Sequence, residues 1–110
     1  MSQIKKTIIQ TKAIKFEIIE DEQIVGRAFL YLIYNELHNN PYGLIEDIFV
    51  SEQSREKGYG SQLLQNIIDE AKAQQCYKLL AQSRYGKTQV HNWYLRHGFI
   101  DHGKNFRLNM

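Results

Sequence analysis

The sequence has a single cysteine, a single proline and no long apolar run. The lone cysteine and the lack of a long apolar run each exclude a class of protein. Cys76 alone cannot form an internal disulfide, which is typical of a reducing compartment, so we expect a cytoplasmic location. No apolar stretch approaches the roughly 20 residues that cross a bilayer, and residues 1–10 lack the apolar segment of a secretory signal. We therefore expect no membrane partner. The formal net charge of +2 is too small to indicate nucleic-acid binding.

Metal-ligand patterns are missing as well. The four histidines (His38, His91, His97 and His102) have no metal-ligand spacing and no cysteine or paired acid to complete a site, so no metal is expected. What is present is ordinary: 110 residues, 43% apolar and 24% charged, predict one globular domain over residues 1–110. Residues 51–110 hold nine basic and five acidic side chains, a mild indication of an anionic ligand.

The first half of the chain has the composition of β-strands. Isoleucine and phenylalanine interleave with lysine, threonine and glutamate, which is typical of strands with one buried face. Gly26 is a candidate for a β-bulge, and Asn39-Asn40-Pro41 is a strong break between strands. We predict an antiparallel meander whose strands cover residues 3–9, 13–20, 24–34 and 42–50. No glycine or proline separates the first two segments, so they could be two strands or one long bent strand.

The second half alternates helices and strands. The apolar residues of segment 59–75 fall on one helical face: Leu63, Leu64, Ile67, Ile68 and Ala71. A strand at residues 77–82 follows, and a strand–helix–strand unit normally makes a parallel pair. A second helix is predicted at about residues 88–97, with Thr88 as N-cap and Gly98 as C′ residue. Short strands are predicted at residues 99–102 and 105–108. The fold class is therefore α/β, a mixed sheet with antiparallel strands followed by a β-α-β-α-β succession.

The segment between strand 42–50 and helix 59–75 has the form of a phosphate-binding loop. It reads Arg55-Glu56-Lys57-Gly58-Tyr59-Gly60, or R-x-x-G-x-G. Amides in the first turn of a helix lack intrahelical acceptors, and glycine lets an anion approach the backbone closely. The alternative is a plain turn with a helix cap. A dinucleotide fold is disfavoured because Leu63 stands where a third glycine is needed, and Gly86-Lys87-Thr88 lacks the glycine that a nucleotide-binding loop has at Ala81.

Two acids interrupt the apolar strand before this loop. Strict alternation would place Glu46 on one face with Ile48 and Val50, and Asp47 on the other with Phe49. Each carboxylate would then lie among hydrophobic side chains, where desolvation raises a carboxyl pKa toward the range of a general base. The alternative is that both acids reach solvent or pair with lysine or arginine.

Three segments in this order resemble the GNAT superfamily of acetyl-CoA-dependent N-acetyltransferases: IEDIFV, then R-x-x-G-x-G into a helix, then NWYLRHGF. The run LIEDIFVSEQSREKGYGSQLL looks particularly like the diamine and polyamine acetyltransferase branch. The resemblance covers roughly residues 24–110. It implies transfer of an acetyl group from acetyl-CoA to a primary amine, either a small molecule or a protein amine.

The resemblance also implies roles for individual residues. Ile48, Phe49 and Val50 would pair with the pantetheine arm, with the Val50 amide facing the thioester carbonyl. Glu46 would be the general base and Tyr94 the general acid that protonates the leaving thiolate. The pyrophosphate would be held by the segment Arg55, Glu56, Lys57, Gly58, Tyr59, Gly60 and Ser61.

The chain departs from the family pattern at two places. The family usually inserts two helices between its first two strands, where only residues 10–13 are available here, and Lys87 replaces an asparagine seven residues before the tyrosine. Without those helices, early aromatic residues (Phe29, Tyr31, Tyr34 and Tyr42) would lack cover, which predicts a homodimer or an open cleft for a large acceptor. A non-catalytic CoA-binding or protein-interaction module with the same fold is the alternative function, and a purely structural domain is a third.

Overall fold

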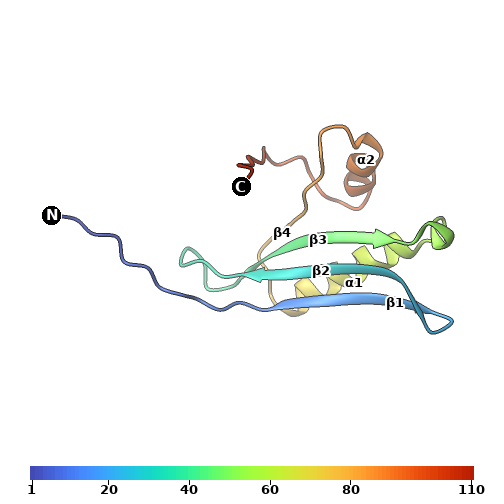
Figure 1. Cartoon of the computed structure of the whole chain (residues 1–110), viewed down its shortest axis with the longest axis horizontal. Helices are drawn as coiled ribbons and strands as arrows, with labels where there is room; N and C mark the ends of the chain where they lie inside the picture. The colour runs from blue at the N-terminus through green and yellow to red at the C-terminus, as the bar shows by residue number, and fades with distance from the viewer. The chain divides into compact units, whose positions relative to one another are not determined.

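Three strands form the antiparallel meander that the sequence predicts. The computed structural model describes residues 1–110, and its strands β1 (Ala13–Glu20), β2 (Gln23–Ile33) and β3 (Tyr42–Val50) lie side by side in chain order (Figure 1). Asp21 and Glu22 join β1 to β2 with φ angles of 51° and 66°. Positive φ at both residues of a two-residue turn suits the twist of a hairpin.

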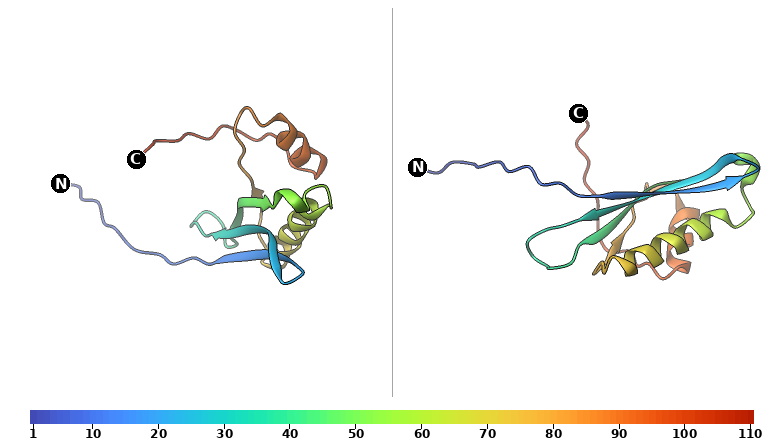
Figure 2. Two further views of the ribbon diagram at one scale, coloured as in Figure 1. Left: turned by 45° about the vertical axis from the view of Figure 1, so that its right-hand side comes forward. Right: turned by 90° about the horizontal axis from the view of Figure 1, so that it is seen from below.

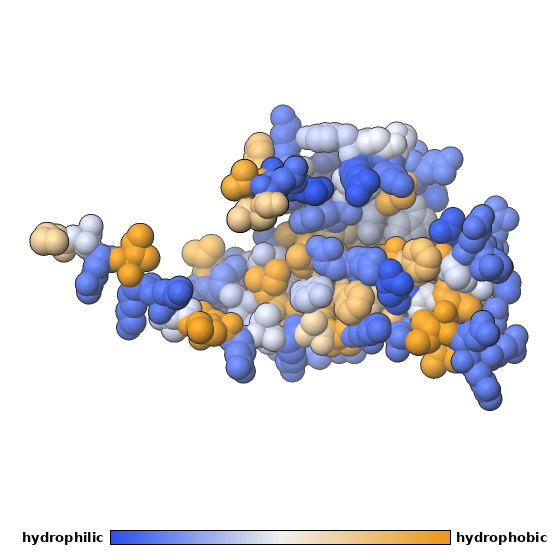
Figure 3. All heavy atoms as spheres, viewed as in Figure 1, coloured by the Kyte–Doolittle hydropathy of each residue, from blue (hydrophilic) through white to orange (hydrophobic).

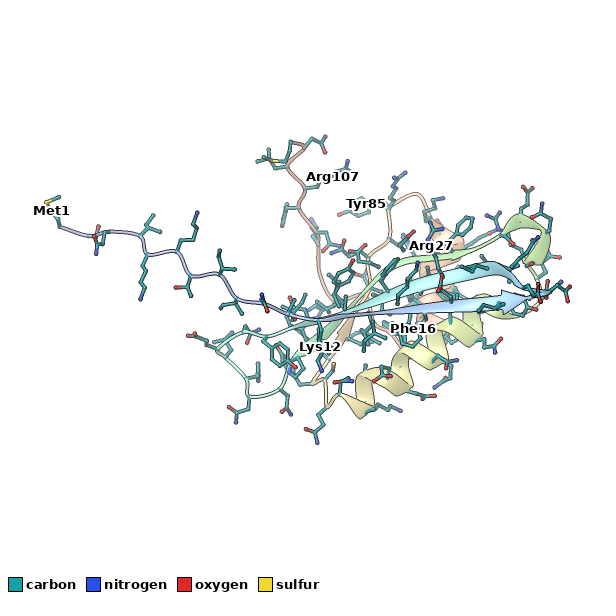
Figure 4. The ribbon with its side chains drawn as sticks, turned by 60° about the horizontal axis from the view of Figure 1, so that its bottom comes forward. Met1, Lys12, Phe16, Arg27, Tyr85 and Arg107 are labelled. Carbon is teal, nitrogen blue, oxygen red and sulfur yellow. The ribbon has the colours of Figure 1, made fainter.

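Helix α1 (Tyr59–Ala73) packs on one face of this sheet and makes the core (Figure 2). The helical face predicted from the sequence is confirmed, since Leu63, Leu64, Ile67 and Ala71 are buried and Ile68 is half-buried. Their partners on the strands are Ala28, Leu30, Leu32 and Ile45. Full burial of an aliphatic side chain of this size contributes roughly 1.5–3 kcal/mol. Phe16 projects to the helix side of the sheet and Arg27 to the other side (Figure 4).

Strand β4 (Leu79–Leu80) runs parallel to β3, as expected for a strand–helix–strand unit. It is shorter than the predicted strand at 77–82, because pairing is confined to Gly43 with Leu79 and Leu44 with Leu80. Gly43 permits this approach. A Cβ there would lie 2.8 Å from Leu79 Cδ1 and 2.9 Å from Leu30 Cδ1, so glycine is needed where β2, β3 and β4 meet.

Three predicted strands are absent. Residues 3–9 form no strand, because pairing with β2 begins only at Lys12, whose carbonyl accepts a hydrogen bond of 3.0 Å from the Leu32 amide. Segments 99–102 and 105–108 also carry no strand. The β-propensity of all three segments is present, but a strand exists only where a partner completes its hydrogen bonds. The final strand of the predicted succession was therefore wrong.

The chain divides into two compact units, residues 1–80 with the sheet and α1, and residues 81–110 with helix α2 (Thr88–Arg96). The N-cap of α2 is Lys87, so the prediction of Thr88 was wrong by one residue. The predicted C-terminus is confirmed. Gly98 has φ of 92°, its amide donates to the Leu95 carbonyl at 3.1 Å, and the Phe99 amide donates to the Tyr94 carbonyl at 3.1 Å. These two hydrogen bonds together are the pattern of a Schellman motif.

Because the chain divides into these two units, one domain over residues 1–110 stays a prediction. Neither α1 nor α2 is long and apolar enough to span a bilayer.

Candidate functional site

A bulge that the sequence pattern did not predict divides β3 in two. Phe29 pairs with Glu46 and Arg27 pairs with Phe49, so one residue of β2 faces two residues of β3, Asp47 and Ile48. Asp47 has φ of 56°, a left-handed conformation that aspartate tolerates better than most residues. The only signal in the sequence was an aspartate within an apolar strand.

The bulge overturns the predicted alternation. Glu46 lies opposite Phe29 and Phe49 opposite Arg27, so Glu46 and Phe49 share the face of the sheet that is turned away from α1. We call this the second face; its members on β1, β2 and β3 are Lys15, Glu17, Arg27, Phe29, Tyr31, Leu44, Glu46 and Phe49. Glu46 and Asp47 are both exposed, so the expected burial among hydrophobic side chains was wrong.

Asp47 forms an ion pair with Arg27, in line with the alternative expectation that the two acids reach solvent or pair with lysine or arginine. Arg27 Nε donates to Asp47 Oδ2 at 2.8 Å, and this hydrogen bond together with the guanidinium charge lowers the pKa of Asp47. The same guanidinium lies 4.8 Å from the centre of the Phe49 ring, within the range of a cation–π contact. Asp47 is thus a fixed anion at the bulge and unsuited to the role of a base at neutral pH.

The backbone at the end of β3 presents polar groups toward the side away from β2. The Ser51 amide donates to the Val25 carbonyl at 2.8 Å, which makes the neighbouring pair Val50 and Gly26 a non-hydrogen-bonded pair. The N–H and C=O of Val50 therefore point away from β2. On that side the pairing with β4 stops at Leu44 and Leu80. The Val50 carbonyl accepts a bond of 3.1 Å from Arg55 Nε, on the loop that follows.

The glycine loop ends at the N-terminus of α1. Gly58 is the N-cap, with φ of 80° and no side-chain cap, and a Cβ there would meet nothing within 4 Å. No acid occupies the first turn of α1, so no carboxylate within that turn repels an anion. Ser61 is exposed in this turn, while Tyr59 and Gly60 are half-buried. The first-turn amides and the helix dipole make this end of α1 suited to phosphate.

A carboxylate from the β1–β2 hairpin is attached to the glycine loop, a feature that sequence analysis did not find. Lys57 Nζ lies 3.2 and 3.3 Å from the two carboxylate oxygens of Glu20, and the Tyr59 hydroxyl donates to the same group. Ser54 Oγ, the one buried polar side chain, lies 3.5 Å from Glu20 Oε1. These bonds lower the pKa of Glu20, with the Tyr59 bond contributing most, and they raise the pKa of Tyr59.

Tyr94 lies in the second unit, within α2. Its ring contacts Trp93 and Phe99 edge to face, with centroid distances of 5.0 and 5.2 Å. Its carbonyl accepts the Phe99 amide in the Schellman motif, which fixes the last turn of the helix around it. The structure gathers Glu46, Val50 and the glycine loop in the first unit, whereas Tyr94 belongs to the second.

Comparisons with known proteins bear on the family and the fold. The profile of the acetyltransferase (GNAT) family matches residues 6–99. A putative acetyltransferase from Agrobacterium tumefaciens is similar at 26% identity, with a TM-score of 0.85 over 92% of this chain and 71% of that one. No curated protein sequence matches this chain.

Two further structures show the same fold. An acetyltransferase from Trypanosoma brucei is 24% identical, with a TM-score of 0.82 over 89% of this chain and 69% of that one. Glucosamine-6-phosphate N-acetyltransferase from Arabidopsis thaliana is 20% identical, with a TM-score of 0.80 over 88% of this chain and 66% of that one.

The family profile, together with the mixed α/β fold of a four-stranded mixed sheet and two helices, places the protein in the general class of N-acyltransferases. The chain belongs to the acetyltransferase (GNAT) family. Acetyl transfer from acetyl-CoA is the general activity that this membership indicates.

Proposed function

We propose that this protein transfers an acetyl group from acetyl-CoA to a primary amine by direct attack, with Glu46 as general base and Tyr94 as general acid. The observation that carries the proposal is the free run of β3 beyond the bulge, directly followed by the glycine loop. There the Val50 N–H points away from β2, and the α1 N-terminus begins after Gly58. An extended thioester arm would hydrogen-bond along Ile48–Val50, and its pyrophosphate would meet the amides of residues 55–61.

The residues present fit acetyl-CoA at both ends. Gly58 leaves its surroundings open, and Arg55 adds a cation at the loop. Acetyl-CoA supplies the activated acetyl group when bound. The Val50 N–H would donate a hydrogen bond to the acetyl carbonyl oxygen as negative charge develops on it. Removal of such a donor typically raises the free energy of the transition state by roughly 3–4 kcal/mol.

Glu46 suits the role of base by its accessibility. An ammonium group has no lone pair, so the amine must lose a proton before it attacks, and Glu46 would take that proton directly or through water. Its side chain is exposed on the second face, next to Phe29 of β2. The role of Tyr94 rests on its place in NWYLRHGF. As acceptors we propose primary amines of the diamine and polyamine type. A protein amine is the alternative acceptor, and the amine panel should include both.

Binding and turnover test the proposal in separate measurements. We expect calorimetry to show acetyl-CoA binding to the wild type, and mass spectrometry with an amine panel to show an acetylated product. Gly58→Asp should abolish binding, because it adds a carboxylate at the anion site and a side chain at φ of 80°. Gly86→Asp is the matched control, because it introduces the same side chain outside the proposed site, at a position where a Cβ meets nothing within 4 Å. Undiminished affinity in Gly58→Asp would contradict the site; binding without turnover would favour the non-catalytic module.

We also propose that a second copy of the chain packs beside the second face and forms one wall of the acceptor site, leaving Glu46 accessible to the amine. On this face Tyr31 is 37% exposed and Phe49 is 41% exposed, and Tyr34, which directly follows β2, is 49% exposed. Basic and acidic side chains alternate on this face, which suits a two-fold contact in which each copy offers both signs. Figure 3 shows apolar and polar side chains interspersed over the strands. Light scattering across dilution should give a dimer; a strict monomer with full activity would favour an open cleft for a large acceptor.

A further inference from the structure

We propose that Glu20 is a positioning residue that fixes the glycine loop in its anion-binding conformation. The inference rests on the proposed function, because it concerns the same phosphate site. Glu20 is the last residue of β1, more than thirty residues before the loop in the chain, and it receives hydrogen bonds from Ser54, Lys57 and Tyr59.

The three donors bracket the part of the loop with unusual backbone conformation. Between Ser54 and Tyr59 the chain passes through Glu56 at φ of 68° and Gly58 at φ of 80°. A non-glycine residue with positive φ persists where its surroundings hold it in place. The Glu20 carboxylate holds one residue before this stretch, one inside it and one directly after it. The β1–β2 hairpin thereby sets the direction of the amides at the start of α1.

The hydrogen bonds to Glu20 also change the role expected for Lys57 in anion binding. Its ammonium group lies 3.2 and 3.3 Å from the two carboxylate oxygens, so part of its charge is offset before any ligand arrives. Anion binding then falls mainly to the backbone amides and Arg55. Arg55 in turn donates to the Val50 carbonyl. Each end of the loop is therefore tied to a neighbouring strand, one by Arg55 and one by Glu20.

The positioning role and a purely electrostatic role of Glu20 predict opposite changes in anion affinity when Glu20 is removed. If Glu20 acted only as a nearby negative charge, its removal would free Lys57 and tighten the binding of an anion. If Glu20 positions the loop, its removal weakens binding although the site becomes more positive. The direction of the change in affinity therefore separates the two roles.

The experiment compares Glu20→Gln with Glu17→Gln. Both side chains lie on β1, are about one-third exposed and pair with one lysine, Lys57 for Glu20 and Lys15 for Glu17. We expect the affinity of Glu20→Gln for coenzyme A in calorimetry to fall about tenfold, the scale of losing a hydrogen bond to a charged group. Glu17→Gln should bind coenzyme A as the wild type does. The KM for S-acetylpantetheine, which has no pyrophosphate, should be the same in all three proteins.

Each outcome decides between the alternatives. Equal or tighter binding of coenzyme A by Glu20→Gln would overturn the positioning role, and so would an equal loss with S-acetylpantetheine. If Glu20→Gln fails to fold, Tyr59→Phe removes one donor hydroxyl alone and should weaken coenzyme A binding in the same direction. A wild type that binds no coenzyme A would defeat the proposed function and this proposal with it. Binding by the wild type and Glu20→Gln alike would defeat this proposal alone.

Discussion

The two halves of β3 differ although they belong to one strand. Residues 42–45 pair with β2 on one side, and Gly43 and Leu44 also pair with β4, while Gly43 and Ile45 are buried. Residues 46–50 pair with β2 alone, carry both acids of the strand and are exposed or half-buried. The bulge at Asp47 separates the halves. The first half is part of the core, and the second leaves backbone groups available to a ligand.

The fold thus provides a binding edge in one half of β3 and keeps its core in the other half. A strand in the middle of a sheet normally has no free backbone hydrogen bonds. Here β4 stops after Leu80, so β3 becomes an edge strand for its second half. Exposed edges tend to pair with other chains, and a bulge with charged neighbours limits such pairing. The Arg27–Asp47 ion pair lies at that bulge.

The largest effect is expected from Glu46→Gln, in the exposed half. We expect kcat to fall roughly a hundredfold or more at neutral pH, because loss of a general base typically lowers the rate by that factor. Acetyl-CoA affinity should stay unchanged, and the rate should recover as pH rises and more amine is already deprotonated. Asp47→Asn is the matched control, since it removes the neighbouring negative charge. An unchanged kcat in Glu46→Gln would remove it from the mechanism.

Tyr94→Phe should act on turnover in the same way. It removes only the hydroxyl that protonates the leaving thiolate, so kcat falls while acetyl-CoA affinity is kept. Tyr85→Phe is the control, because Tyr85 lies in the same unit and is 84% exposed. Equal steady-state rates for the two variants and the wild type would contradict the acid role.

A stability effect is expected in the buried half, at Gly43→Ala. The new Cβ would lie under 3.0 Å from methyl groups of Leu30 and Leu79, so both must shift, at a cost of about 1–3 kcal/mol in the free energy of unfolding. Urea denaturation measures it. Gly86→Ala should change stability little, because the space beside it is open. Equal unfolding midpoints would show that β4 does not depend on the missing side chain.

The smallest effect is expected at the bulge itself and depends on pH. The pKa of Asp47 is lowered from its ordinary value of 3.8 by Arg27, so the pair adds stability at neutral pH and loses it as pH falls through that lowered pKa. Asp47→Asn should lack this acid-dependent loss. Unfolding curves at pH 7 and below pH 3.8 compare the two proteins. Both side chains are largely exposed, so the difference is small. Parallel curves would mean that the pair adds nothing.

Local signals in the sequence predicted most of the elements. Apolar residues spaced for one helical face predicted α1, alternation predicted the meander, and Gly98 predicted the end of α2. The glycine pair before α1 predicted the loop. These features depend on residues close together in the chain, so a single sequence contains enough information for them. The strands at 3–9, 99–102 and 105–108 were wrong because strand formation depends on a partner elsewhere.

By itself, the sequence determined the strand–loop–helix unit and the residue types that line it, since propensity, periodicity and glycine placement act within a few residues. Only the tertiary structure decided how that unit is used. The bulge that brings Glu46 and Phe49 to one face, the end of β4 that frees Val50, and the attachment of Glu20 to the loop all depend on register between distant segments. Register is fixed by the joint packing of β2, β3 and α1, and one inserted residue reverses every side chain beyond it.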